Sequence, residues 1–453
     1  MKRAVAGLVR LLVDLFYRRV EVTGLDNVPS EGPVLFVANH VNGLVDPMLV
    51  LRVIERPIVF VAKSTLWKIP LLRTVLDLLG CVPVVRRGEE DREISSKGEE
   101  RNRGSFEKLA EVLERDGAIL IFPEGRSHSD PRLSEIRTGA ARVLLLSKKS
   151  PVVLPVGLWF TKKEEFRSEV LVKVGPPVAP PVDPTVEAWT EAIERALLGV
   201  TLNADDWEDH EAVAVVEALY GSKIPGERTT RAFLKGGEGE SELARSFRNR
   251  RLLLAAREAL KRVEPGAVAH VARSARALDH LLRKIGLSPG ALDNPPPPRV
   301  ILWNTFKALL LVLLGFPVAV LGVVAWWVPY RLCGAIANRV PGASAHRDQI
   351  ALYKLLSGVL LFPITLAVWT GAAWGLGGTV WGTLALLLLP FAGILSLVYV
   401  EYASWRERQA RELLALAFRP GGIARLRVRR DALVAECDRL ADAFRRASDN
   451  RSA

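Results

Sequence analysis

The stretch NHVNGLVDP, Asn39 to Pro47, places a histidine and an aspartate in one short segment. His40 stands six positions before Asp46, with mostly apolar residues and one glycine between them. Asn39 and Gly43 favour a tight turn that would bring the carboxylate back to the imidazole. A carboxylate on one ring nitrogen fixes the tautomer and leaves the other nitrogen to take a proton from a hydroxyl. The stretch predicts either a general base oriented by Asp46 or a loop histidine that is only hydrogen-bonded.

A second polar cluster is FPEGRSH, which begins directly after a strand-like run. Its Gly125 would let the backbone approach a ligand closely. Arg126 supplies a planar fork suited to phosphate. Glu124 could hold that arginine or a substrate hydroxyl. Together these residues indicate an anion-binding loop, although a single arginine is more often a solvated surface charge.

Other cations also follow strand-like runs. Arg86 lies at the end of GCVPVVRR, and Lys63 lies in VFVAKSTLWKIP. The segment IRTGAAR, which contains Arg137, reads as the start of a helix whose amides could face an anion. The combination predicts one base and several anion-binding groups on the same face of a domain.

The sequence does not suggest a covalent nucleophile or a metal centre. No G-x-S-x-G elbow is evident, so we expect direct attack by a substrate hydroxyl. The three cysteines form no CxxC pair and no cluster with histidine, which predicts neither a disulfide framework nor a metal site. We expect no metal or redox cofactor, and a reducing compartment for the soluble part.

The elements that must position these residues alternate between strand and helix patterns from about residue 20 to 185. This alternation predicts an α/β domain with a mostly parallel sheet flanked by helices. Its polar motifs come just after strands, where open α/β sheets gather ligands. We place this domain at residues 21–200. The preceding residues 1–20 predict an amphipathic helix, either in the membrane interface or on the surface of its own domain.

The rest of the chain changes character twice. Residues 201–292 are charged and helical, and the Pro-rich segment 293–299 is a stiff linker. Residues 308–330 and 355–400 then carry no charge, and a bilayer core needs roughly 20 apolar residues per helix. The segment 355–400 predicts a transmembrane helical hairpin that turns near GLGGTVWG, with a buried hairpin of a soluble protein as the alternative.

Charge sets the expected topology of the membrane region. The net charge is +12, and the loop 331–354 and the helical tail 401–453 are both basic. By the positive-inside rule, this loop, the tail and the α/β domain would all prefer the cytoplasm, which three simple spans cannot satisfy. We therefore expect the segment 300–330 to be a re-entrant or membrane-spanning helix, with re-entry the arrangement that satisfies the rule.

Four blocks in this order carry a family resemblance: NHVNGLVDP, GCVPVVRR, FPEGRSH and VVLPVGLWF. The chain resembles the glycerol-phosphate and lysophosphatidate (1-acylglycerol-3-phosphate) acyltransferase family over about residues 5–220. That family usually has four residues between the histidine and aspartate of its first block. This chain has five, in the form H-x-N-G-x-x-D-P, which resembles the subgroup similar to fungal glycerol-3-phosphate acyltransferases.

The resemblance implies a role for each matching position. His40 would deprotonate the acceptor hydroxyl and Asp46 would orient it. The resulting alkoxide would attack an acyl thioester of CoA or acyl carrier protein, the co-substrate, without a covalent acyl-enzyme. The acceptor phosphate would be bound by cations and neighbouring groups, and the fourth block would line the acyl or thioester region. The substrate-binding set is Lys63, Arg86, Glu124, Gly125, Arg126, Ser127 and Arg137, and the acyl region holds Pro155 and Val156.

The resulting expectation is a membrane-bound O-acyltransferase of phospholipid synthesis. Its acceptor would be glycerol-3-phosphate or 1-acylglycerol-3-phosphate, with another lysophospholipid or dihydroxyacetone phosphate as alternatives. It would be an integral membrane protein that contacts membrane lipids, with its catalytic domain on the cytoplasmic face of a bacterial inner membrane or the endoplasmic reticulum. A non-catalytic lipid-binding scaffold is the alternative from another class. A nucleic-acid partner is not expected, because no aromatic–basic stacking module accompanies the basic charge.

Overall fold

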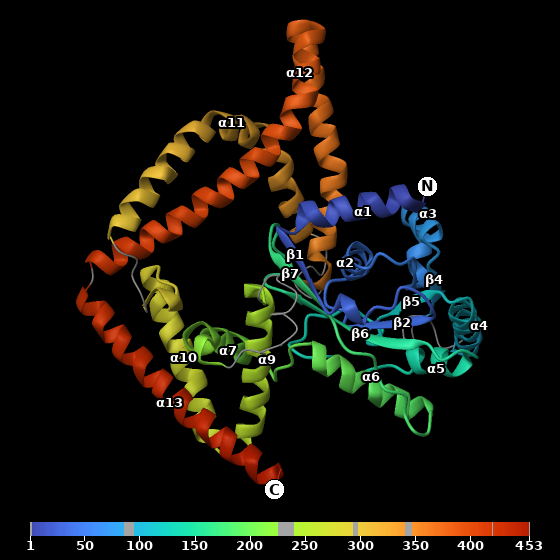
Figure 1. Cartoon of the computed structure of the whole chain (residues 1–453). Helices are drawn as coiled ribbons and strands as arrows, with labels where there is room; N and C mark the ends of the chain where they lie inside the picture. Colours follow the sequence, from blue (N-terminus) through green and yellow to red (C-terminus); the bar gives the residue numbers. More distant parts are fainter. Residues whose placement is uncertain are drawn as a thin grey trace. The chain divides into compact units, whose positions relative to one another are not determined.

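The structure is a computed structural model of the chain, and it describes residues 2–85, 95–224, 240–292, 298–339, 347–418 and 420–452 (Figure 1). The chain divides into two compact units. The first comprises Met1–Asp206, Glu238–Phe247 and Val340–Leu352. The second comprises Trp207–Gly237, Arg248–Arg339 and Tyr353–Ala453.

A seven-stranded sheet of order β1-β7-β6-β2-β5-β3-β4 forms the centre of the first unit. Strands β6, β2, β5, β3 and β4 run parallel, whereas β7 is antiparallel to β6 and parallel to β1. The prediction of a mostly parallel sheet is therefore confirmed. The strands are β1 (Arg19–Thr23), β2 (Val34–Ala38), β3 (Ile58–Lys63), β4 (Val82–Val84), β5 (Ala118–Ile121), β6 (Val152–Phe160) and β7 (Glu169–Val174).

The middle of this sheet is buried on both faces, which explains the uninterrupted apolar runs. Every residue of β2, VLFVA, is buried, and β2 lies between β5 and β6. An alternating apolar–polar pattern would leave polar groups in the core of such a strand. Because β2 is fully buried between two strands, it fixes the start of the following loop, which carries functional side chains.

Helices cover both faces of the sheet, as Figure 1 shows. One face packs on α4 (Ser95–Glu114), α5 (Gly139–Leu146) and α6 (Val186–Val200), whose apolar residues share a core with Leu35 and Ile119. The other face carries α1 (Lys2–Phe16), α2 (Val45–Val53) and α3 (Pro70–Leu79). The prediction of a sheet flanked by helices is confirmed.

Helix α1 is amphipathic as predicted. Val13 and Phe16 are buried in the first unit. Leu8, Leu11 and Leu15 are exposed along another stripe. One stripe therefore packs on its own domain, and the insertion of the other into a membrane interface stays a prediction.

In the second unit, apolar residues of α7, α10 and α13 form a core. Leu253 of α9 packs against this core, which also includes Tyr220 and Leu282. The helices are α7 (Trp207–Tyr220), α9 (Glu242–Lys261, whose first residues belong to the first unit), α10 (Pro265–Ile285) and α13 (Pro420–Ser452). The helical character predicted between residues 201 and 292 is present in the described part of that segment.

In the part of the chain that the structure describes, two helices, α11 (Pro298–Arg339) and α12 (Ile350–Phe418), are long and apolar. Judged by length and composition alone, Gly315–Arg339 and Arg347–Gln409 could each cross a membrane. α12 leaves helical geometry at Gly378, where φ is 74° and ψ is −168°. A Cβ added to Gly382 would touch the Trp374 side chain, so the chain folds back there. This break falls within GLGGTVWG, where the turn of the hairpin is predicted.

Helix α11 packs against both arms of that hairpin. The Trp326 indole donates to the Leu389 carbonyl in the second arm, and Trp369 in the first arm donates to the Ala325 carbonyl. α11 runs without a break through Pro317 and Pro329. The segment 300–330 is thus a continuous helix wherever the structure describes its backbone, and whether it crosses a bilayer stays a prediction.

Candidate active site

The site lies at the carboxyl edge of the parallel strands, and its first anchor is Asn39. The Leu158 amide of β6 donates to Asn39 Oδ1 at 2.7 Å, and Asn39 Nδ2 donates to the Leu158 carbonyl at 3.1 Å. This reciprocal pair ties the end of β2 to the neighbouring strand. The backbone therefore leaves the sheet at a defined point, one residue before His40.

His40 and Asp46 come together as the turn predicts. His40 Nδ1 lies 2.9 Å from Asp46 Oδ2, and the same oxygen accepts the Asn42 amide at 2.7 Å. The intervening loop reverses at Gly43, whose φ of 51° is in the left-handed region. Asp46 then sits in the first turn of α2 with no exposed side-chain area. One tight turn is thus enough to bring the carboxylate to the imidazole in this five-residue loop.

The other ring nitrogen of His40 is the one available for chemistry. Among the residues that the structure describes, none hydrogen-bonds His40 Nε2, and the His40 side chain is 12% exposed. The Phe122 ring stacks on the imidazole with a centroid distance of 4.2 Å. With Nδ1–H donating to Asp46, Nε2 presents a lone pair that can accept a proton.

Glu124 links the two loops of the site. Its Oε1 accepts the His40 backbone amide at 2.6 Å, and its Oε2 accepts the Ser134 amide at 2.7 Å. Oε2 also pairs with Nε2 of His128. Glu124 has no exposed side-chain area, and both of its carboxylate oxygens accept hydrogen bonds from groups inside the protein. Its predicted contact with substrate stays a prediction.

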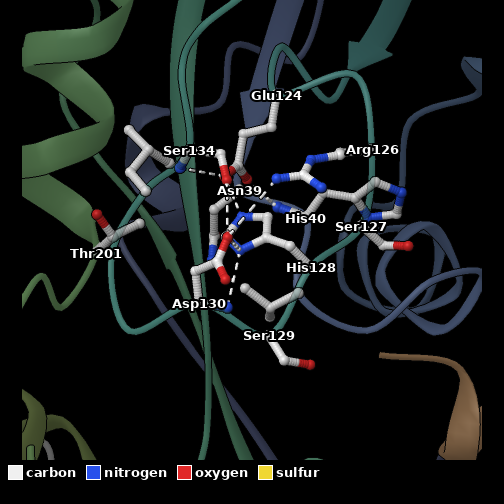
Figure 2. Close-up of polar contacts among 12 residues, drawn as sticks. Asn39, His40, Glu124, Arg126, Ser127, His128, Ser129, Asp130, Ser134 and Thr201 are labelled. Atoms are coloured by element: carbon white, nitrogen blue, oxygen red, sulfur yellow. Dashed lines mark hydrogen bonds and ion pairs between the residues drawn. The ribbon is translucent and has the colours of Figure 1, made fainter. Parts of the chain in front are cut away.

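His128 completes this network, which Figure 2 shows. The Asp130 amide donates to His128 Nδ1 at 3.1 Å, so the ring proton lies on Nε2 and is donated to Glu124. The backbone amide of His128 donates to the His40 carbonyl at 3.1 Å. The loop after β5 is therefore held against the loop after β2 through both backbone and side chains.

A buried polar layer also contacts the His40 loop. Asn42 Nδ2 donates to the Tyr17 hydroxyl at 2.9 Å and to the Lys163 carbonyl at 3.2 Å. Lys163 Nζ donates to the Val41 carbonyl at 2.8 Å and to Ser129 Oγ at 2.7 Å. Lys163, in the β6–β7 loop, thus links the loop after β2, which carries His40, to the loop after β5.

Burial sets the charge properties of this layer. Burial lowers the pKa of the Lys163 amine, while the carboxylates of Asp46, Asp348 and Glu164 oppose that shift. Burial, and then the charge of Asp46, raise the pKa of the Tyr17 phenol well above its ordinary value. Tyr17 is therefore a neutral hydroxyl at physiological pH.

The predicted anion-binding cations lie in different settings. Arg126 and Arg137 are both exposed, each with 67% of the side chain accessible. Arg126 lies 3.9 Å from Asp130, and Arg137 lies 3.5 Å from Glu135. Both pairs are solvent-screened, so the guanidinium groups can exchange these partners for a phosphate.

The backbone brings these two cations to the same loop region. Gly125 has a φ of 71°, and a Cβ there would approach Arg137 Cγ to 3.4 Å. The Arg137 amide also donates to the Pro123 carbonyl at 2.7 Å. FPEGRSH and IRTGAAR therefore lie side by side, as a shared anion site requires.

The other predicted site residues are Lys63, Pro155, Val156 and Arg86. Lys63 is half-buried at the end of β3. Pro155 and Val156 are buried in β6, in register with Val37 and Ala38 of β2. Arg86 lies outside the described residues. No group of three or more metal-ligating side chains occurs within the part of the chain that the structure describes.

Several polar residues of the site are not predicted from the sequence. The sequence signal for a role of His128 is its position in FPEGRSH, four residues after Glu124. Tyr17 and Lys163 carry no comparable signal, because each lies outside the four blocks or at their margin. Their contacts with Asn42 join residues 25 and 121 positions apart.

Comparisons with known proteins agree with the resemblance. Residues 19–159 match the Acyltransferase family model. The chain is 29% identical over 144 residues to a 1-acyl-sn-glycerol-3-phosphate acyltransferase of Borreliella burgdorferi, covering 32% of this chain and 52% of that protein. It is 29% identical over 134 residues to glycerol-3-phosphate O-acyltransferase 2 of Saccharomyces cerevisiae, covering 26% and 18% respectively.

A solved structure gives a further similarity. The 1-acyl-sn-glycerophosphate (LPA) acyltransferase PlsC of Thermotoga maritima shares 22% identity and a TM-score of 0.35, covering 44% of this chain and 79% of that one. The matched region spans about half or less of the two curated relatives. His40, Asp46 and the Glu124 loop all lie within residues 19–159, the part of the chain that matches the Acyltransferase family model.

Proposed function

We propose that this protein is a membrane-bound O-acyltransferase that uses glycerol-3-phosphate or 1-acylglycerol-3-phosphate as acceptor. The observation that carries the proposal is the His40–Asp46 pair, whose Nδ1 and Oδ2 lie 2.9 Å apart, with no described residue hydrogen-bonded to Nε2 of His40. The family match and the similarity to acyltransferases acting on both kinds of acceptor support it. The donor would be a fatty acyl thioester of CoA or acyl carrier protein.

The geometry supports a direct transfer. Nε2 of His40 takes the proton of the acceptor hydroxyl as its oxygen attacks the thioester carbonyl. Asp46, bonded to Nδ1, stabilises the imidazolium that forms. The tetrahedral adduct then collapses, the C–S bond breaks, and the thiolate leaves with the proton returned by His40. The products are an ester and a free thiol, and no group on the protein is acylated.

The acceptor phosphate would be bound by Arg126 and Arg137. Both guanidinium groups are exposed, and their present acidic partners lie at 3.5 Å or more. A phosphate can form bidentate, charge-assisted hydrogen bonds with an arginine, which are stronger than these screened pairs. In this proposal the anion binds in the loop that is hydrogen-bonded to the His40 loop, and the buried Glu124 does not contact it.

The two candidate spans support a membrane location for the reaction. A lipid acceptor or product has a long apolar chain that is soluble in the bilayer and not in water. A catalytic domain on the cytoplasmic face would meet both the bilayer and a water-soluble thioester. The basic charge of the chain would attract anionic lipid on that face.

The experiment is radiolabelled acyl transfer by the full chain in liposomes. Acyl-CoA and acyl carrier protein thioester would each be offered with glycerol-3-phosphate, lysophosphatidate, dihydroxyacetone phosphate or lysophosphatidylcholine. The wild type would be compared with His40→Ala and, as a control, with His270→Ala at an exposed position of α10. Ester formed with one of the first two acceptors and lost only in His40→Ala supports the proposal. No product with any donor–acceptor pair would reject it and favour a lipid-binding scaffold.

A further inference from the structure

A short segment directly before α12 is docked against the loops of the candidate site. It consists of Arg347–Gln349, and it belongs to the first unit together with residues up to Leu352. The first turn of the long apolar helix α12 follows at once, at Ile350. This segment is 221 positions from Ser127, the residue it contacts in the FPEGRSH loop.

Asp348 is the centre of this contact. Its side chain is 4% exposed, and its Oδ2 accepts a hydrogen bond from Ser127 Oγ. Burying a carboxylate is costly unless hydrogen bonds or an opposite charge compensate it. The Ser127 hydrogen bond provides part of that compensation, and the Lys163 amine, which bonds the Val41 carbonyl and Ser129 Oγ, is close enough to interact electrostatically with Asp348. The contact between Asp348 and Ser127 is therefore a buried hydrogen bond to a carboxylate, and it differs from an incidental contact between exposed side chains.

The same segment reaches the other two loops of the site. The Asp348 carbonyl faces Gly43 in the His40–Asp46 turn, where an added Cβ would lie 3.1 Å from that oxygen. Arg347 Nε lies 2.8 Å from Glu164 in the β6–β7 loop. Residues 347 and 348 thus contact the loops after β2, β5 and β6, whose relative positions define the site.

The Ser127 hydroxyl has one proton, and in this arrangement the hydroxyl donates its hydrogen bond to Asp348. It therefore cannot donate to a substrate phosphate at the same time. The residue before Ser127, Arg126, has an exposed side chain whose ion pair with Asp130 is solvent-screened. Fixing Ser127 restricts the backbone from which Arg126 reaches for an anion, which reduces the ordering cost on binding.

We propose that Asp348 is a positioning residue for the acceptor-phosphate loop, acting through Ser127 and linking that loop to the start of α12. The inference rests on the proposed acyltransferase function. Its consequence is that recognition of the phosphorylated acceptor depends on a residue outside the acyltransferase-family region of the chain. The thioester donor, which does not use this loop, is affected less.

The test is steady-state kinetics of the full chain with separate titrations of acceptor and donor. Asp348→Ala is expected to raise the acceptor KM about tenfold or more, the loss of one hydrogen bond to a charged group. The donor KM and kcat should change by less than about threefold. Asp348→Asn, whose amide oxygen can still accept from Ser127, should recover part of the acceptor KM. Asp26→Ala, an exposed acid in the same unit, serves as the matched control.

A double-mutant cycle separates this role from direct substrate binding by Ser127. If Ser127 acts through Asp348, then Ser127→Ala combined with Asp348→Ala should be no worse than either change alone. Additive effects would overturn the proposal, as would an unchanged acceptor KM in Asp348→Ala. An equal fall in kcat/KM for the acceptor and for the donor would show a general structural role and also overturn it. A wild type inactive with every acceptor would instead reject the proposed function itself.

The folded state of each variant is checked by thermal unfolding. If Asp348→Ala does not fold, Asp348→Asn and Ser127→Ala still test the proposal. Ser127→Ala removes the hydrogen-bond donor and keeps the buried Asp348 carboxylate. It should then raise the acceptor KM as Asp348→Ala is expected to do, and an unchanged KM in both variants would contradict the inference.

Discussion

Two histidine–carboxylate pairs lie side by side in this site, and they are used differently. His40 bonds Asp46 through Nδ1, and its Nε2 has no hydrogen bond to any residue that the structure describes. His128 bonds Glu124 through Nε2 and accepts the Asp130 amide with Nδ1. The His40 side chain is 12% exposed and that of His128 is 5% exposed. A base needs one nitrogen that is both basic and reachable, so only the first pair is suited to catalysis.

The second pair supports the first. Glu124 accepts the His40 amide, and the His128 amide donates to the His40 carbonyl. The His128–Glu124 pair therefore holds the backbone on both sides of the catalytic candidate. Residue types and short spacing are alike in the two pairs, and the difference comes from which ring nitrogen is occupied.

The largest effect is expected from His40→Ala. Removal of a general base typically costs about 10²–10⁴-fold in kcat. The free energy of unfolding should fall by no more than about 1–3 kcal/mol, because the ring makes one side-chain hydrogen bond, to the buried Asp46. The measurement is kcat for acyl transfer beside the thermal unfolding temperature. If activity persisted at the wild-type level, the distinction between the two pairs would collapse.

Asp46→Asn should reproduce much of that loss. An asparagine cannot hold the same tautomer or stabilise the imidazolium as a carboxylate does. Because His40 and Asp46 act as a unit, the double variant should be about as inactive as His40→Ala alone. Strictly additive losses would mean that the two residues act independently.

Glu124→Gln tests the supporting pair. The carboxylate accepts the His40 and Ser134 amides and bonds His128, and an amide has only one oxygen acceptor. We expect a loss of about 1–3 kcal/mol in the free energy of unfolding, since buried donors are left unpaired. Chemical denaturation measures this. A variant as stable as the wild type, but with a much higher acceptor KM, would favour the predicted substrate-binding role.

His128→Ala should separate structure from catalysis. It removes both of the ring's hydrogen bonds and should destabilise the fold by about 1–3 kcal/mol. The folded fraction should keep kcat within about tenfold of the wild type, far above His40→Ala. His270→Ala, on an exposed position of α10, is the control for loss of a histidine. A pH–rate profile that changes in His128→Ala, and not in His40→Ala, would reverse the assignment.

The smallest effect concerns Tyr17 at alkaline pH. Because its pKa is raised in the folded state, the folded chain keeps a proton that the unfolded chain releases above about pH 10. The stability that Tyr17 contributes is complete below that pH and falls as pH rises through the folded pKa. The wild type should therefore lose up to about 1.4 kcal/mol per pH unit more than Tyr17→Phe. Unfolding across this range, with Tyr402→Phe as control, checks the sign, and equal slopes would contradict it.

Much of the fold follows from local pattern. Alternating strand and helix signals predict a mostly parallel sheet, and the uncharged segment around GLGGTVWG predicts a turn where Gly378 breaks α12. The spacing of His40, Gly43 and Asp46 likewise predicts their contact, because one tight turn decides it. These features are settled by residues close together in the chain, so the order of amino acids is sufficient.

The sequence by itself determined the candidate base, its carboxylate and the strands that hold them. Only the tertiary structure decided that β7 runs antiparallel, that Glu124 faces inward, and which loops meet around His40. The contacts of Lys163 with Val41 and of Ser127 with Asp348 span 122 and 221 positions. Hydrophobic periodicity specifies which face of a strand is buried, but not which distant loop lies beside it. That choice depends on strand order and on compensating buried charges, which exist only once the chain has folded.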